Sequence, residues 1–344
     1  MPQPHRGGER SERVLCGREH GGAVQVLSST ILGCVGGVFR EQSSGQNPQF
    51  FSPPQPNKEL DFFEIMVDFG PSQQEFHIGQ GSVAIPGNTA GLLEVHQRLG
   101  QVPLLAVLEP AVVAARSGVI LNEAQAYLIK ILEPILINST GGCDLFRPNG
   151  KLLKKGDRFQ NPSFADFLNM LVAEGSRYFY EGDGAELILN TVGQQGLITR
   201  ECLSQYTVVE RQPLKSQFRG KTIYTNPAPA TGGTLITFAL QLMDQSDRNS
   251  KFDFTNLVKA TQMSSTARRD FCHDMKNEMQ ISQVLTPKIF NKYLDLFNSG
   301  FTISHPQNDP LSRGATTHVS ILDKQGNAAS VTTTNGEGCG YIIP

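Results

Sequence analysis

Thr316–Leu322 (TTHVSIL) and Ala328–Thr334 (AASVTTT) are two seven-residue segments rich in β-branched residues, and the turn-forming residues Asp323–Asn327 (DKQGN) join them. Side chains branched at Cβ favour strands, whereas Asp, Gly and Asn favour tight turns. Two strand-like runs separated by so short a loop pair with each other in antiparallel fashion. The stretch therefore predicts a β-hairpin close to the end of the sequence.

The length of the loop also predicts which residues face each other. If Leu322 pairs with Ala328, the antiparallel register brings Thr316 opposite Thr334. Directly opposed residues of such a pair have Cβ atoms about 5 Å apart. Two hydroxyl-bearing residues are thus expected side by side, which would be an ordinary cross-strand threonine pair if no chemistry were attached to it.

The chain upstream of the hairpin alternates between helical and turn-rich segments. Apolar residues at helical spacing, with residues that favour helix ends on either side, predict several helices. They are expected from Asn88 to Gly100, from Pro110 to Gly118, from Asn122 through Leu132, from Asn161 to Gly175, over Ala185–Val192 and over Leu235–Met243. Thr207–Asn226 alternates polar and apolar residues around Arg219-Gly220, which predicts strands.

The composition excludes several classes of function. The 344 residues carry 30 Lys and Arg against 32 Asp and Glu, a net charge of −2, so no basic surface is expected to attract nucleic acid. None of the six cysteines belongs to a CxxC pair, and no histidine lies at zinc-ligand spacing from any of them. We therefore expect free thiols, no metal site and no nucleic-acid partner.

Residues 1–58 differ in composition from the rest and are expected to be poorly defined, as a disordered or non-native N-terminus. No apolar run approaches the roughly 18 residues that span a bilayer. Ile31–Cys34 resembles the end of a lipoprotein signal, but the acidic residues before it and the polar residues around it argue against export. The compartment is therefore left open: cytoplasmic by default, or periplasmic if the N-terminus is not native.

Five upstream motifs and the hairpin together resemble one known family. The upstream motifs are Ala84–Gly87 (AIPG), Glu109–Ala111 (EPA), Phe179–Gly182 (FYEG), Leu197–Thr199 (LIT) and Tyr224–Gly233 (YTNPAPATGG). The hairpin adds TTHVS from Thr316, with Asp323, Gly326-Asn327 and Ser330–Thr332. In this order and spacing they are similar to the gamma-glutamyltransferases, or glutathione hydrolases, among the N-terminal-nucleophile hydrolases. The resemblance covers residues 59–344.

The resemblance implies an α+β fold, a four-layer αββα sandwich with two antiparallel sheets between layers of helices, here incomplete. It divides the chain into a large-subunit region, residues 59–315, and the start of a small subunit, residues 316–344. Family members are cut from one precursor into a heterodimer of these subunits. They transfer the gamma-glutamyl group of glutathione or a similar amide to water or to an amino-acid or peptide acceptor, and no cofactor is implied.

Thr316 is the expected nucleophile, and Ala315-Thr316 is the expected self-cleavage site. A threonine hydroxyl is a poor nucleophile at neutral pH and needs a base. Cleavage before Thr316 would free its own α-amine, whose pKa of about 8 is close enough to neutrality for the amine to accept the hydroxyl proton. The small residues of Ser312–Ala315 suit the bend that such a cleavage requires. The resemblance assigns Thr334 the role of orienting the nucleophile by a hydrogen bond.

Substrate binding is expected just beyond the hairpin. Two positions after Thr334 many family members carry a polar residue that contacts the glutamyl end of the substrate, and here that position is Gly336, between Asn335 and Glu337. Gly336–Gly340 does not read as a phosphate loop, because no Lys follows it and Glu337 would repel phosphate. A mobile loop over the acyl pocket is the preferred interpretation.

Thr231–Gly233 is expected to open a helix and leaves two interpretations. Backbone amides at a helix N-terminus can hold an anionic group. The same residues can equally form a tight loop that leads into a core helix.

The sequence departs from the family pattern in two respects. Asp68–Pro71 (DFGP) stands where many members have Asp-Phe-Arg-Glu, whose arginine binds the substrate α-carboxylate. Only 28 residues follow Thr316, so the family's oxyanion glycines, glutamate-binding groups and several strands are expected to be missing. Losing one oxyanion donor typically costs roughly 100- to 1000-fold in rate, and helices such as Leu235–Met243 are expected to lack a sheet to pack on.

Two alternatives to a gamma-glutamyltransferase therefore stay open. One is a non-catalytic, truncated fragment. The other is an acylase of the same fold that acts on another amide, because the residues that hold glutamate are absent.

Overall fold

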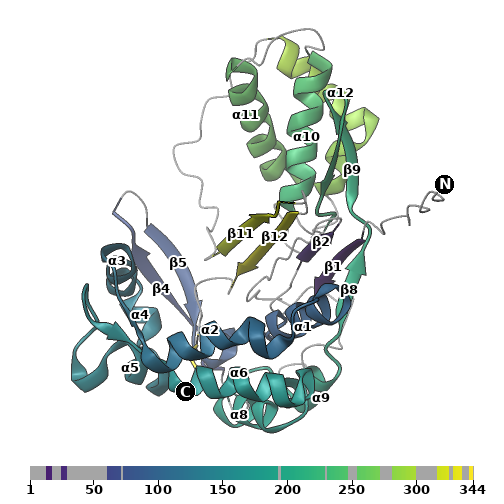
Figure 1. Ribbon diagram of the computed structural model, residues 1–344. Coiled ribbons are helices and arrows are strands. Elements are labelled where there is room, and N and C mark those ends of the chain that lie inside the picture. The colour runs from purple at the N-terminus through teal and green to yellow at the C-terminus, as the bar shows by residue number, and fades with distance from the viewer. Residues whose placement is uncertain are drawn as a thin grey trace, which may run out of the picture.

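The computed structural model describes residues 13–17, 25–28, 60–70, 73–192, 195–228, 231–246, 254–271, 281–299, 316–324, 328–334 and 341–343. It is a mixed fold in which helices pack around antiparallel sheets (Figure 1). This confirms the predicted α+β class, while the arrangement in four layers stays a prediction. Within the described ranges, no helix is long and apolar enough to cross a membrane.

The largest sheet has five antiparallel strands and lies in the middle of the molecule (Figure 1). In spatial order the strands are β11 (Thr316–Leu322), β12 (Ala328–Thr334), β2 (Gln25–Ser28), β1 (Arg13–Gly17) and β8 (Val208–Arg211). The predicted hairpin thus occupies one edge of the sheet. The sequence did not predict β1, because a strand of five residues offers little alternation to read and its partners lie elsewhere in the chain.

Three helices form a bundle next to a small hairpin, at the top of Figure 1. The helices are α10 (Thr231–Ser246), α11 (Phe254–Phe271) and α12 (Pro287–Asn298), and the hairpin consists of β9 (Leu214–Phe218) and β10 (Lys221–Thr225). Arg219 and Gly220 connect the two strands with positive φ angles of 48° and 72°. Both central residues of a type I′ hairpin turn require such angles, so the predicted turn at Arg219-Gly220 is confirmed.

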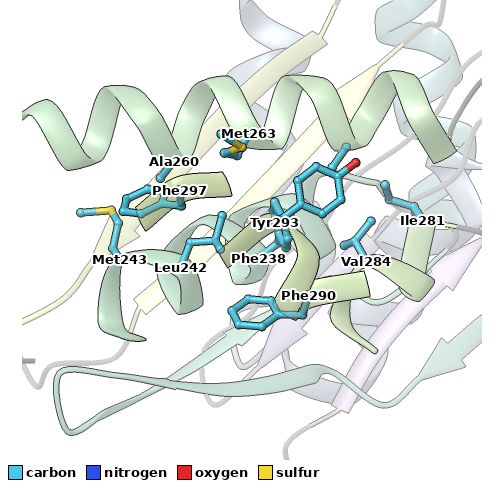
Figure 2. Packing of buried hydrophobic residues seen from close by; sticks show 11 residues of the cluster. Phe238, Leu242, Met243, Ala260, Met263, Ile281, Val284, Phe290, Tyr293 and Phe297 are labelled. Atoms are coloured by element: carbon cyan, nitrogen blue, oxygen red, sulfur yellow. The ribbon is translucent and has the colours of Figure 1, made fainter. Parts of the chain in front are cut away.

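Aromatic side chains fill the centre of this bundle (Figure 2). The ring of Phe238 stands at right angles to the rings of Phe290 and Tyr293, with centroids 5.9 and 5.3 Å apart. Phe238 and Leu242 are fully buried, and burying side chains of this size stabilises a fold by about 1.5–3 kcal/mol each. Leu235–Met243 was expected to lack a sheet to pack on, and this is wrong, because α10 contacts the β9–β10 hairpin as well as α11 and α12.

A second group of helices lies below the central sheet in Figure 1. It comprises α1 (Asn88–Leu99), α2 (Leu104–Ser117), α6 (Pro162–Glu174), α7 (Ser176–Tyr180), α8 (Asp183–Val192) and α9 (Arg200–Ser204). Helix α1 contacts β1 and β8, and its Arg98 donates a hydrogen bond of 2.8 Å to Glu210 of β8. Tyr180, Ile188 and Leu203 are buried where α7, α8 and α9 meet.

A third group stands at the left of Figure 1. It contains a hairpin of β4 (Phe63–Asp68) and β5 (Gln73–Ile78), the helices α3 (Glu123–Ile131), α4 (Glu133–Leu136) and α5 (Thr140–Phe146), the strand pair β6 (Val119–Ile120) and β7 (Arg158–Phe159), and the 3-10 turns η1 (Gln80–Ser82) and η2 (Pro148–Gly150). One face of the hairpin buries Val67, Phe76 and Ile78 against Ile135 of α4.

Most predicted helices are present, and the predicted caps at Asn122 and Asn161 are confirmed, whereas Asn88 is the first residue of α1 and does not cap it. The Asn122 side chain accepts a hydrogen bond from the Gln125 amide, and the Gln125 side chain accepts one from the Asn122 amide, so α3 begins with a capping box. The Asn161 side chain accepts from the Phe164 amide at the start of α6. Helices α1, α8 and α10 cover the ranges predicted for them.

The predicted start of α2 is wrong. The helix begins at Leu104, directly after Pro103, and Pro110 lies inside it. Proline inside a helix removes one backbone hydrogen bond and is normally disfavoured by about 3 kcal/mol, so the sequence predicts a helix start at Pro110. Helix α2 instead continues through Pro110 and packs along α6.

Candidate functional site

The hairpin β11–β12 has the predicted register throughout. Its seven facing pairs run from Leu322 with Ala328 to Thr316 with Thr334. The pairing of the two threonines, predicted from the length of the turn alone, is therefore confirmed for the backbone. The other predicted site residues, Ala315, Asn335, Gly336 and Glu337, lie outside the described residues, and their roles stay predictions.

Among the described strands, it is β12 that joins the hairpin to the rest of the sheet. Val331 and Thr332 of β12 face Val26 and Gln25 of β2, whereas β11 is the edge strand. The edge strand exposes apolar side chains, since Val319, Ile321 and Leu322 are 49%, 60% and 73% exposed. Such an edge presents both backbone hydrogen-bonding groups and apolar surface to the outside.

Three polar side chains form a hydrogen-bonded triangle across the hairpin. Nε2 of His318 lies 2.8 Å from Oγ of Ser320 and 2.8 Å from Oγ of Ser330, and the two hydroxyl oxygens are 3.2 Å apart. His318, Ser320 and Ser330 lie in the hairpin motif, and the sequence alone predicts no role for them. The two-residue period of a strand was the available signal, because it places positions 316, 318 and 320 on one face.

Tyr341–Ile343, beyond β12, pack against residues of the helical region upstream of the hairpin. Ser139 Oγ donates a hydrogen bond of 2.6 Å to the carbonyl oxygen of Ile342. Ile342 also contacts the core formed around Leu121 and Leu153, while Tyr341 and Ile343 contact the core around Tyr180. The segment beyond β12 is thus held at a second place, away from the sheet.

Two of the family-like motifs meet at the buried hydroxyl of Tyr180. This hydroxyl donates to the carbonyl oxygen of Pro86 (2.5 Å) and accepts from the amide of Ala90 (3.1 Å). Burial raises the pKa of Tyr180 far above its usual range, so the hydroxyl keeps its proton. The ring stacks on Tyr206 with centroids 5.5 Å apart. These contacts give the FYEG and AIPG motifs a structural role.

The beginning of α10 is a close approach between two backbone segments. A Cβ atom on Gly233 would lie 2.0 Å from the carbonyl oxygen of Asn226, so no other residue fits without movement. Thr225 Oγ1 donates to the Gly233 carbonyl oxygen at 3.2 Å and lies 3.3 Å from Thr237 Oγ1. These contacts favour the tight-loop interpretation of Thr231–Gly233 over the anion-binding one.

The segment that lacks the family's arginine is the turn of the β4–β5 hairpin. Asp68 Oδ1 accepts a hydrogen bond of 2.7 Å from the Gly70 amide, and Gly70 has a φ of 86°. Asp68 and Gly70 therefore serve the geometry of the turn, a role for which no arginine is needed.

The same hairpin brings Glu64, Glu75 and His77 together. Glu64 faces His77, whose Nε2 lies 3.4 Å from Glu64 and 3.7 Å from Glu75, and the three potential ligand atoms lie within 4.8 Å of one another. Spacing between Cys and His, on which the prediction of no metal rested, does not reveal such a cross-strand group. Both carboxylates are about half exposed, as in ordinary surface ion pairs, and the absence of a metal site stays a prediction.

Comparison with known proteins identifies the family. The family model "Gamma-glutamyltranspeptidase" matches residues 56–344. The chain belongs to the gamma-glutamyltranspeptidase family. Among curated proteins it is 31% identical over 272 residues to the glutathione hydrolase proenzyme of Escherichia coli, covering 75% of this chain and 46% of that protein. It is 26% identical over 280 residues to the capsule biosynthesis protein CapD proenzyme of Bacillus anthracis, covering 80% and 49%.

Solved structures agree on the fold. Gamma-glutamyltranspeptidase from Helicobacter pylori superimposes with a TM-score of 0.58 at 21% identity, covering 79% of this chain and 78% of that one. Cephalosporin acylase from Bacillus halodurans gives a TM-score of 0.60 at 17% identity, covering 98% and 59%. This family member spans about half the length of the curated relatives that it matches.

Proposed function

We propose that this family member hydrolyses or transfers gamma-glutamyl groups through an acyl-enzyme on Thr316, after cutting itself between Ala315 and Thr316. The observation that carries the proposal is the register of β11–β12, which opposes Thr316 to Thr334 at the predicted place. It is supported by the match to the gamma-glutamyltranspeptidase family and by relatives named glutathione hydrolase proenzyme.

Self-cleavage would begin with attack of the Thr316 hydroxyl oxygen on the carbonyl carbon of Ala315. The carbon–nitrogen bond breaks, the hydroxyl proton passes to the leaving amine, and an ester joins the two parts. Water then hydrolyses the ester, which leaves a carboxylate on Ala315 and restores the Thr316 hydroxyl beside a free α-amine. Large and small subunits arise from one precursor in this way.

Turnover would use the same hydroxyl again. The α-amine of Thr316 accepts the hydroxyl proton while the oxygen attacks the gamma-carbonyl carbon of glutathione or a similar amide. The amine of the substrate leaves with a proton, and the gamma-glutamyl group remains on Thr316 as an ester. Water releases glutamate, or the amine of an amino acid or peptide takes up the gamma-glutamyl group. Thr334 orients the nucleophile from the facing strand.

Mass spectrometry of the purified chain tests the first step. We expect two products, residues 1–315 and 316–344, and a single uncut chain for Thr316→Ala. Thr317→Ala is the matched control, since it changes the next threonine of the same strand and should leave cleavage intact. An uncut native chain, or a cut that persists in Thr316→Ala, would remove Thr316 from the mechanism.

Two amide substrates separate this proposal from its alternatives. A gamma-glutamyl anilide and an anilide of a dicarboxylic acid without the α-amino group are compared on the cleaved protein. Release of aniline from the first substrate supports a gamma-glutamyltransferase, and preference for the second supports an acylase. Release from neither substrate by a protein that has cut itself supports the non-catalytic alternative.

A further inference from the structure

The threonines at the end of β12, Thr332–Thr334, do not by themselves determine which of them faces Thr316. If β12 slipped by two residues along β11, every side chain would stay on its face, and Thr332 instead of Thr334 would come opposite Thr316. Among the described residues, β12 is the strand that pairs with the edge strand β11. The five-residue connection between Leu322 and Ala328 favours the observed register, and the slip would shorten this connection to three residues. A second feature can add to this preference.

The apolar face of the hairpin is a weak selector. Val319 faces Val331 and Ile321 faces Ala329, but Ile321 remains 60% exposed, so little apolar surface would be lost in a slipped register. Contacts between apolar side chains are also non-directional, and they tolerate a shift better than hydrogen bonds do.

The polar triangle of His318, Ser320 and Ser330 is directional. In the observed register Ser320 faces Ser330, and Nε2 of His318 reaches both hydroxyl oxygens at 2.8 Å. After a slip of two residues Ser320 would face Ala328, which has no hydroxyl, and the contact between the two serines would be lost. The triangle thus discriminates between two registers that the threonines do not distinguish.

We propose that His318, Ser320 and Ser330 are positioning residues that reinforce the register favoured by the turn between β11 and β12, and so hold Thr334 as the partner of Thr316. The consequence for catalysis rests on the proposed function, whereas the register itself does not. None of the three acts on substrate; they act through the placement of Thr316.

Disulfide trapping measures the register without any activity. Val319→Cys with Val331→Cys links the strands in the observed register, and Val319→Cys with Ala329→Cys links them after a slip of two residues. These positions lie on the face opposite the triangle. Peptide mass spectrometry identifies the linked pair in the presence of the six natural cysteines.

With the triangle intact we expect the 319–331 link alone. With Ser330→Ala, or with Ser320→Ala as a second variant, the 319–329 link should appear in comparable amount. Ile321→Ser, on the opposite face, is the control and should keep the 319–331 link alone. Only the 319–331 link in both serine variants would overturn the proposal.

Kinetics tests the positioning role separately. In Ser330→Ala we expect kcat to fall on the order of 100-fold, as for a misplaced reacting group, with KM nearly unchanged, and Ser330→Thr should recover most of kcat. A full kcat in a variant whose strands have slipped would overturn the positioning role. A native chain that never cleaves itself would overturn the proposed function instead, and the trapping result would still decide the register.

Discussion

At the scale of single residues, Tyr180 joins two segments that lie far apart in sequence. Its hydroxyl is both donor to Pro86 and acceptor from Ala90, at the start of α1. The side chain is 6% exposed, so water cannot replace either partner. A buried polar group that loses its partner costs about 1–3 kcal/mol.

Tyr180→Phe should therefore destabilise the fold by about 1–3 kcal/mol, because the Pro86 carbonyl and the Ala90 amide lose their common partner. Denaturant unfolding of the two proteins measures the difference. Tyr178→Phe on the same helix is the matched control and should change stability by less than about 0.5 kcal/mol. Equal stability of the Tyr180→Phe variant and the native chain would show that the two hydrogen bonds contribute nothing.

The same tyrosine predicts a dependence on alkaline pH. Burial raises the pKa of Tyr180 above the ordinary value of 10.0 in the folded state, so above that pH the unfolded chain loses a proton that the folded chain keeps. Below pH 10 this difference does not affect the free energy of unfolding. Above pH 10 the free energy of unfolding falls by about 1.4 kcal/mol per pH unit. Unfolding measured between pH 9 and 11 should show this slope, and Tyr180→Phe should reduce it.

At the scale of elements, the junction between β10 and α10 has room for no side chain at Gly233. The carbonyl oxygen of Asn226 occupies the place of a Cβ atom there, whereas a Cβ on the neighbouring Gly232 would meet nothing within 4 Å. Of these two adjacent glycines, only Gly233 is required by the close approach of the backbone; nothing in the structure explains glycine at position 232.

Gly233→Ala should destabilise the fold by about 1–3 kcal/mol through overpacking. Gly232→Ala should be neutral or stabilise it by about 0.5–1 kcal/mol, because alanine restricts the unfolded chain and favours a helix. Thermal or denaturant unfolding of the pair provides its own control. Equal effects of the two changes would contradict the close approach of Asn226.

The edge strand β11 predicts self-association. Ile321 is 60% exposed on a strand that lies at the edge of the sheet formed by the described strands, and natural proteins often place charges at such positions. Ile321→Lys should raise the concentration at which light scattering detects aggregates. Val113→Lys, at an exposed apolar position of α2, is the control and should have little effect if the edge strand is responsible.

Elements specified by residues close together in sequence were predicted better than elements that depend on contacts between distant segments. The hairpin β11–β12 and the helix start at Asn122 are specified by residues close together in sequence, and both were predicted, although the reciprocal hydrogen bond of Gln125 was not. The start predicted at Pro110 is wrong because the helix continues through this proline, next to α6, in a contact that no local pattern reveals. β1 was missed for the same reason, since its partners β2 and β8 make it a strand.

The candidate site shows the same division. The facing of Thr316 and Thr334 followed from the turn, whereas the triangle around His318 requires side-chain orientations that a sequence does not give. The chemistry of Thr316 came from the resemblance to a family and not from spacing. Its assignment as nucleophile accordingly stays a proposal.

At the scale of the whole molecule, the proposed cut would fall between parts that remain in contact. β12 pairs with β2, and Ile342 accepts a hydrogen bond from Ser139. After cleavage we expect residues 1–315 and 316–344 to stay together under native conditions. Native mass spectrometry should show one complex, and the same sample in denaturant should show two chains. Separation under native conditions would contradict the contacts described for Tyr341–Ile343.

After the proposed cut, the second anchor at Tyr341–Ile343 would make residues 316–344 a bivalent ligand of the rest of the chain. Each anchor, once open, can reclose before the other opens, because the closed one keeps it at high local concentration. The piece escapes only when both are open together, so its release rate depends on the product of two opening probabilities. Weakening one anchor, as Ser139→Ala would, should therefore speed release by a large factor while the other anchor alone still binds.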